Sequence, residues 1–233
     1  MSKCVCASGI RKLQNIMLER DYILRMFQML GQALSRIVFF KETKGYAQAL
    51  VEIDKAAPAI LGLSVDMIER IPVSGLRDVL GSDPALLHSK LYAAGVLLKE
   101  KAEILELQEE SDGSARLYMK SLVLFVEDLS PLKDREDDRE IKSIDFAIEK
   151  LKEYELPVEL KHRLVLYFEI MGRYDQAENT VFEIVDDDRG YLKEGISFCE
   201  RLLLKSDSEL ESGRLPRNEV EESLAVLQKR SAD

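Results

Sequence analysis

Few residues of this sequence have the type and spacing to carry chemistry, and none of them forms a complete site. Cys4 and Cys6 form a Cys-x-Cys pair, but no histidine or third cysteine lies near them in the sequence to complete a tetrahedral zinc site. His88 and His162 stand alone on separate predicted helices, without the neighbouring groups that metal binding or general-base catalysis needs. We therefore predict no metal site and no cofactor.

The other reactive or acidic residues also lack the context of an active site. The acidic run Asp186–Asp188 lacks the glycine and the trailing glutamate of a calcium-binding loop, which indicates solvated charge. Neither a phosphate-binding glycine loop nor a Gly-x-Ser-x-Gly motif occurs. Cys199 lies in an apolar helical pattern that is typical of a buried, unreactive thiol. The sequence therefore predicts a protein that is not an enzyme.

The composition is that of a globular protein, with 46% hydrophobic and 33% charged residues in a chain of 233 residues. The net charge of −10 disfavours nucleic acid as a partner, because affinity for phosphates comes chiefly from Lys and Arg. No apolar run approaches the ~20 residues that a bilayer-spanning helix needs, so we expect no stable membrane insertion. Three cysteines and the lack of a secretory-signal pattern at residues 1–16 predict a cytoplasmic location.

The charge is distributed unevenly along the chain. Residues 1–44 contain eight basic and three acidic residues, so this segment carries +5 and the remainder carries −15. Such an asymmetry favours head-to-tail or domain-to-domain attraction. Ordinary variation of surface charge is the alternative explanation.

Apolar residues recur with helical spacing along nearly the whole chain, and no segment alternates as a half-buried strand does. We expect helices over residues 21–40, 46–57, 64–70, 74–81, 83–110, 115–129, 141–154, 157–172, 174–185, 189–206 and 218–229. Ser64, Ser74 and Asp83 are expected N-caps. Asn218, with Glu221 three residues later, is expected to form a capping box for the last helix.

The helix expected at residues 21–40 is apolar over more than half of its circumference. Such a helix lies in the centre of a bundle or covers a partner. The side chains that widen the apolar face beyond one stripe are the predicted interface residues: Tyr22, Met26, Met29 and Phe40.

Helix–turn–helix units share one local pattern. The clearest has Gly172 and Tyr174 at its turn and Ala177 three residues later. In this interpretation glycine lets the chain reverse, tyrosine fills the space between two helices, and alanine allows close approach. The segment resembles a tetratricopeptide repeat. Residues 39–57 repeat the pattern with Tyr46 and Ala49, and residues 97–126 repeat it loosely with a turn at 112–115. The units lack the fixed 34-residue period of a regular array.

The stretch from residue 19 to residue 230 also resembles a bacterial family of tetratricopeptide-like helical proteins of unknown function. Three segments carry this resemblance: DYILRM at residues 21–26, GRYDQAE at residues 172–178 and LPRNEVE at residues 215–221. The resemblance implies a helical fold and no particular activity.

The predicted fold is all-α, an irregular tetratricopeptide-like stack of antiparallel helical hairpins forming an α-α superhelix. We expect residues 1–18 to be a tail that is either disordered or included because the translation start was assigned too far upstream. We expect N-terminal hairpins at 19–130, a charged linker or exposed helix start at 131–140, and C-terminal hairpins at 141–233. One continuous domain over residues 19–230 is the alternative division.

Repeat folds bind partners on the concave surface that their inner helices line. In the clearest hairpin this surface is predicted to carry Glu159, His162, Leu166, Glu169 and Ile170, although a neighbouring helix of the same chain could fill it instead. The leading functional hypothesis is a non-enzymatic scaffold that binds a protein partner or a second copy of itself as a homo-oligomer. The alternative is a regulatory protein with a small-molecule pocket inside the helical stack.

Overall fold

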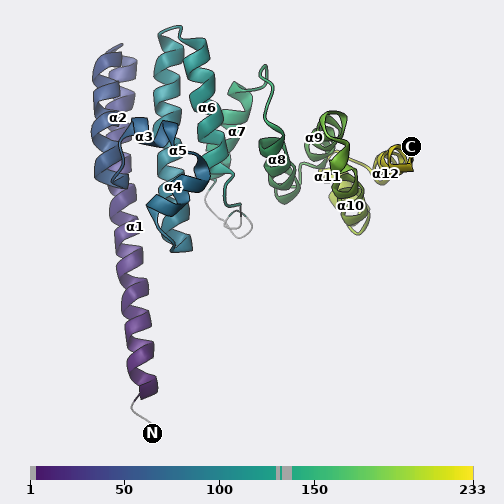
Figure 1. Ribbon diagram of the computed structural model, residues 1–233, viewed down its shortest axis with the longest axis horizontal. Coiled ribbons are helices and arrows are strands. Elements are labelled where there is room, and N and C mark those ends of the chain that lie inside the picture. Colours follow the sequence, from purple (N-terminus) through teal and green to yellow (C-terminus); the bar gives the residue numbers. More distant parts are fainter. Residues whose placement is uncertain (1–3, 130–131, 133–137, 233) are drawn as a thin grey trace. The chain divides into compact units, whose positions relative to one another are not determined.

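The computed structural model describes residues 4–129, 132 and 138–232, with side chains from residue 19 onward (Figure 1). Every regular element within these residues is helical, which confirms the predicted all-α class. None of the helices searched among these residues is both long and apolar enough to cross a bilayer. The chain forms two compact units, which comprise Met1–Phe125 with Arg139–Tyr154 and Val126–Asp138 with Glu155–Asp233.

The first unit is built around one long buried helix. Its helices are α1 Cys4–Glu42, α2 Tyr46–Leu61, α3 Val65–Arg70, α4 Val73–Leu80, α5 Pro84–Leu107, α6 Ser111–Phe125 and α7 Arg139–Lys150. Helix α5 packs against α1, α2, α3, α4, α6 and α7. Burial of α5 on several sides explains why its apolar residues do not form a single stripe.

The closest packing in this unit is between α5 and α6. A Cβ atom on Gly95 of α5 would lie 2.6 Å from the ring of Phe125 on α6. The Ser121 hydroxyl donates a hydrogen bond to the Gly95 carbonyl over 2.8 Å. Glycine is therefore required at this position so that the two helices can approach each other closely.

The second unit contains two pairs of packed helices. Its elements are α8 Val158–Ile170, α9 Tyr174–Asp187, the 3-10 turn η2 Arg189–Tyr191, α10 Leu192–Leu203, α11 Asp207–Ser212 and α12 Arg217–Ala232. Helix α8 packs against α9, and α10 packs against α12. The guanidinium of Arg163 on α8 donates to the carbonyls of Val126 and Glu127, which fixes the segment after α6 to this unit.

The turn from α8 to α9 follows the predicted pattern with one difference. Gly172 adopts a left-handed φ of 68°, and Ala177 is fully buried against α8. The Tyr174 ring, however, packs against the next hairpin, because a Cβ on Gly213 would lie only 2.1 Å from the ring. Tyr174 thus links the turn at α8–α9 to the loop between α11 and α12.

The other predicted turns reverse through non-glycine residues. The chain turns before α2 at Lys44, with φ of 58°, and before α6 at Glu109, with φ of 64°. The turn predicted at 112–115 is therefore wrong, because α6 begins at Ser111 and Gly113 lies in its first turn. Helix α5 accordingly ends at Leu107.

Some predicted helix caps are correct and others are not. Ser64 and Asp83 accept hydrogen bonds from the amides of Met67 and Leu86, as expected. The predicted capping box at Asn218 is wrong, because α12 begins one residue earlier, at Arg217. Likewise α4 begins at Val73, so the predicted N-cap Ser74 is inside the helix. A capping box that was not predicted lies at Ser206 and Glu209 and begins α11.

The domain division differs from the predicted one at both ends of the first unit. Helix α1 begins at Cys4, whereas we expected a tail at residues 1–18. Most of the predicted linker at 131–140 lies outside the described residues. Helix α7 belongs to the first unit rather than to a C-terminal domain that begins at 141, because its buried Ile144 and Ala147 and the Phe146 ring face α5 and α6.

Candidate functional site

The five predicted groove residues lie on α8, and the neighbouring elements η2 and α10 contact two of them. Glu159 and Leu166 are exposed, the latter by 51%, whereas His162, Glu169 and Ile170 are partly buried. This exposure pattern leaves Leu166 as the apolar centre of the face. The prediction that the face binds a partner stays a prediction.

Contacts from η2 and α10 bridge this face on both sides of Leu166. The His162 ring stacks on Tyr191 of η2, with ring centroids 4.4 Å apart and planes at 13°. The Glu169 carboxylate accepts two hydrogen bonds from Arg201 of α10, at 3.1 and 2.7 Å. The same chain therefore covers part of the predicted groove, and Leu166 remains exposed between these two contacts.

The pKa values of Arg201 and Tyr191 are both raised, for different reasons. The hydrogen bond to Glu169 is the main cause that raises the pKa of the Arg201 guanidinium. Burial raises the pKa of the Tyr191 phenol. At neutral pH the Tyr191 phenol therefore stays neutral and the Arg201 guanidinium stays cationic. Within the described residues the buried Nε2 of His162 has no hydrogen-bond partner.

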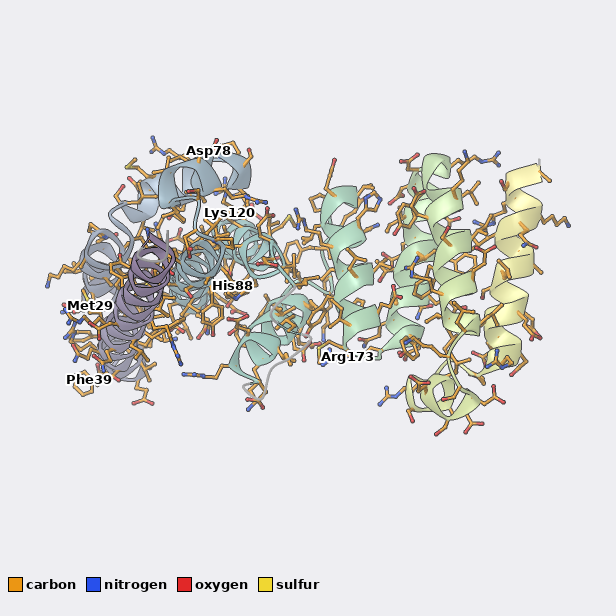
Figure 2. All side chains as sticks on the ribbon, turned by 90° about the horizontal axis from the view of Figure 1, so that it is seen from below. Met29, Phe39, Asp78, His88, Lys120 and Arg173 are labelled. Atoms are coloured by element: carbon orange, nitrogen blue, oxygen red, sulfur yellow. The ribbon has the colours of Figure 1, made fainter. Side chains whose placement is uncertain are left out.

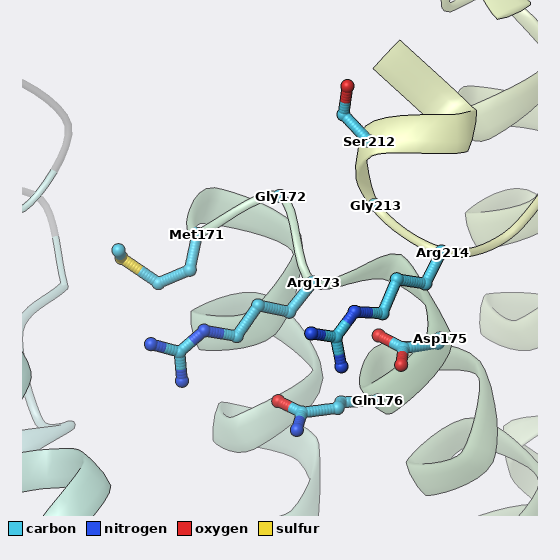
Figure 3. Close-up of a pocket in the computed structure, with 8 residues that line it drawn as sticks. All are labelled: Met171, Gly172, Arg173, Asp175, Gln176, Ser212, Gly213 and Arg214. Carbon is cyan, nitrogen blue, oxygen red and sulfur yellow. The ribbon is translucent and has the colours of Figure 1, made fainter. Parts of the chain in front are cut away.

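A polar pocket of about 320 Å³ lies in the same unit, where the α8–α9 turn meets the loop between α11 and α12 (Figure 3). Its lining residues are Met171, Gly172, Arg173, Asp175, Gln176, Ser212, Gly213 and Arg214. In Figure 3 the side chains of Arg214, Asp175 and Gln176 converge on the same space. In that view the Arg214 guanidinium lies beside the Asp175 carboxylate, whereas the Arg173 guanidinium extends away from both, over the Tyr167 ring.

Several of the residues considered as candidates for chemistry contact other charged side chains of the chain. Asp186, Asp187 and Asp188 are exposed, as predicted for solvated charge, and Arg230 and Lys161 pair with the first two at 2.6 and 3.0 Å. His88 is not isolated, since its Nε2 lies 3.2 Å from both carboxylate oxygens of Glu140. In the part of the chain that was described, no group of three or more His, Cys, Asp or Glu side chains could hold a metal ion.

Cys199 is buried on α10, which confirms the predicted burial of this thiol. Burial raises the pKa of this thiol to about 11. Because the thiolate is the reactive form of cysteine, such a pKa suppresses its nucleophilicity at neutral pH.

The predicted interface on α1 is exposed at two of its four residues. Tyr22 and Met29 are exposed, and Phe40 is partly buried beside the ring of Phe39. Met26 is only 3% exposed, so its assignment to an interface is wrong. Its side chain belongs to the core of the first unit because it faces the helices that pack against α1.

Sequence reasoning missed three further exposed apolar residues on α1: Leu24, Val38 and Phe39. Leu24 is 62% exposed and Phe39 is 58% exposed. Figure 2 shows Met29 and Phe39 at the outer edge of the first unit. We name Tyr22, Leu24, Met29, Val38 and Phe39 together the α1 apolar surface. By the helical period, Tyr22 and Met29 lie on one flank of α1 and Leu24 and Val38 on the opposite flank, with Phe39 between them. The seven-residue spacing from Leu24 through Gly31 to Val38 was the signal that could have revealed part of it.

A buried ion cluster holds α1 against α5. Lys41 of α1 pairs with Glu100 and Glu103 of α5, at 2.5 and 2.7 Å. Lys99 pairs with the same two carboxylates at 2.9 and 2.6 Å. Burial lowers the pKa of Lys41, but the charges of Glu100 and Glu103 outweigh burial and leave the pKa raised. The cluster is neutral, because two lysines match two glutamates.

Comparison with known proteins gives a family and no activity. The model of a family of unknown function (DUF6483) matches residues 17–232. The chain belongs to this family. The DUF6483 match includes the α1 apolar surface, α8 and the polar pocket. No curated protein and no solved structure matches the chain.

Proposed function

We propose that this DUF6483 protein is a non-enzymatic scaffold that self-associates through the α1 apolar surface, and that it acts in the cytoplasm. The observation that carries the proposal is the exposure of five large apolar side chains on one helix. Large exposed apolar side chains are typical of protein interaction sites, since water contact with them costs free energy that a partner can remove.

The geometry of α1 suits a second copy of the same helix. Leu24, Gly31 and Val38 recur every seven residues along α1, the spacing at which two helices stay in contact. A Cβ atom on Gly31 would find no atom within 4 Å, so a partner backbone can approach closely there. The N-terminal end of α1 extends past α5 (Figure 1).

The charge of α1 permits this pairing. Between residues 19 and 42 the helix carries four basic and three acidic residues, and Lys41 is neutralised inside the ion cluster. The surface is therefore close to neutral, and two copies of it do not repel each other strongly. The ion cluster also fixes α1 to α5, so that little conformational entropy is lost when a partner binds.

Light scattering coupled to size-exclusion chromatography tests the proposal. We expect the full chain to be a dimer and the Leu24→Glu/Phe39→Glu variant to be a monomer. Burial of each side chain is worth ~1.5–3 kcal/mol, so the double change should raise the dimer dissociation constant by at least about a hundredfold.

Leu204→Glu is the matched control, because Leu204 is 87% exposed but lies at the end of α10, outside the α1 apolar surface. This variant should remain a dimer. A wild-type chain that stays monomeric from micromolar to millimolar concentration refutes the proposal, as does a dimer that both variants leave intact.

A further inference from the structure

A second pocket, in the first unit, has a strongly basic lining. It has a volume of about 470 Å³ and lies between α3, α5 and α6. The lining residues are Glu69, Arg70, Lys101, Leu105, Gly113, Arg116, Leu117 and Lys120. Four of these are basic and one is acidic, so the lining carries +3 in a chain whose net charge is −10.

The single carboxylate of the lining is already paired. Glu69 accepts a hydrogen bond from the Lys101 ammonium at 2.5 Å. That pair is locally neutral, and it leaves Arg70, Arg116 and Lys120 as the charge of the pocket. Neither Arg70 nor Arg116 makes a side-chain hydrogen bond or ion pair with any described residue, and both are exposed.

Lys120 differs from an ordinary surface lysine. It is half-buried, and its ammonium donates a hydrogen bond of 2.6 Å to the neutral carbonyl of Ile71. Figure 2 shows Lys120 on the same side of the first unit as Asp78, which lies on α4. Burial lowers the pKa of Lys120, which means that desolvation of the ammonium is not offset by a carboxylate. An anion in the pocket would supply that missing partner.

The residue types favour a phosphoryl group over other anions. A guanidinium presents a planar fork of donors that matches two oxygens of a phosphate. Two unpaired guanidinium groups and one ammonium together match the charge of a phosphate monoester dianion with one positive charge to spare. The buried Leu117 and the partly buried Leu105 give the pocket an apolar wall, and its volume lies in the range of small-molecule sites.

We propose that this pocket binds a small phosphorylated molecule, with Arg70 and Arg116 on the phosphoryl oxygens, Lys120 as a third cation and the two leucines against the rest of the ligand. The site lies outside the α1 apolar surface. The inference is therefore independent of self-association, and either one can fail alone. It gives the protein a means to respond to the concentration of a phosphorylated metabolite.

Isothermal titration and thermal unfolding of the full chain, with pyrophosphate as the probe at constant ionic strength, test the site. We expect saturable binding and a melting temperature that rises with probe concentration. Arg70→Gln and Arg116→Gln should each weaken binding by about tenfold, because each removes charge-assisted hydrogen bonds. Both side chains are exposed and unpaired within the described residues, so the melting temperature without probe should not change.

Arg189→Gln is the matched control, since Arg189 is an exposed arginine of the second unit. It should bind pyrophosphate like the wild type. The proposal is overturned if pyrophosphate stabilises the chain no more than chloride does, or if Arg70→Gln and Arg116→Gln bind it normally. Equal affinity for malonate would overturn the assignment to a phosphoryl group. A single-stranded oligonucleotide that displaces pyrophosphate at lower concentration would overturn the assignment to a small molecule.

Discussion

Gly213 provides the most direct test of how the second unit is held together. In Gly213→Ala the new Cβ would lie 2.1 Å from Cδ2 of Tyr174 and 2.8 Å from the carbonyl oxygen of Gly172. Carbon atoms pack at about 3.5–4.0 Å, so the buried ring must move by more than an ångström or the loop must open. Overpacking of this kind costs about 1–3 kcal/mol, and we expect the upper end because backbone blocks one direction of relief.

Urea unfolding followed by circular dichroism measures the effect. Glu211→Ala is the control, because Glu211 is exposed on α11, so this change should shift the free energy of unfolding by less than about 0.5 kcal/mol. If Tyr174 is the obstacle, Tyr174→Ala combined with Gly213→Ala should cost less than the sum of the two single changes. A Gly213→Ala variant within about 0.5 kcal/mol of the wild type would refute the proposed packing.

Three further predictions follow from the buried polar groups. Lys41→Met should destabilise the first unit by about 3 kcal/mol in urea unfolding, because it leaves two buried glutamates with one lysine. The control Lys55→Met breaks an exposed ion pair and should cost less than about 1 kcal/mol. Burial raises the pKa of Glu103, but Lys99 and Lys41 outweigh burial, so the pKa in the folded protein is lowered. The contribution of Glu103 to stability should therefore be full above its unfolded pKa of about 4.3 and be lost as the pH falls through the lower folded pKa. Urea unfolding at a series of pH values would detect this loss. Cys199, with a pKa of about 11, should resist iodoacetamide at pH 8 until urea unfolds the second unit, as mass spectrometry of its peptide would show.

The helical class and the α8–α9 turn could be predicted from sequence because both depend on local signals. Helical spacing reports the class, and Gly172 reports a turn that needs a left-handed backbone. The turn before α2 was also predicted, but residues with side chains rarely adopt positive φ, and nothing in the type of Lys44 or Glu109 indicates that these two residues do so. Gly113 attracted the turn prediction for that reason, although it lies inside α6.

The candidate sites were harder to predict from the sequence because they depend on contacts between residues that are far apart in the chain. The α8 face could be predicted from spacing within one helix, whereas the contacts of Tyr191 and Arg201 with it depend on packing across the unit. An apolar pattern identifies side chains that prefer burial, but it does not reveal which of them find a partner, and so Met26 and Leu24 were misjudged in opposite directions. The basic pocket joins three helices, and no segment of the sequence contains it.

The path of the chain between the two units affects how the protein folds during synthesis and where it can be truncated. After α6 the chain enters the second unit, returns to the first as α7, and then completes the second. During synthesis α7 can pack against α6 only after α7 has emerged from the ribosome. Until then the apolar face of α6 that α7 covers stays exposed to solvent and to chaperones. A fragment that stops at residue 130 should aggregate, whereas one that continues to Tyr154 contains every helix of the first unit.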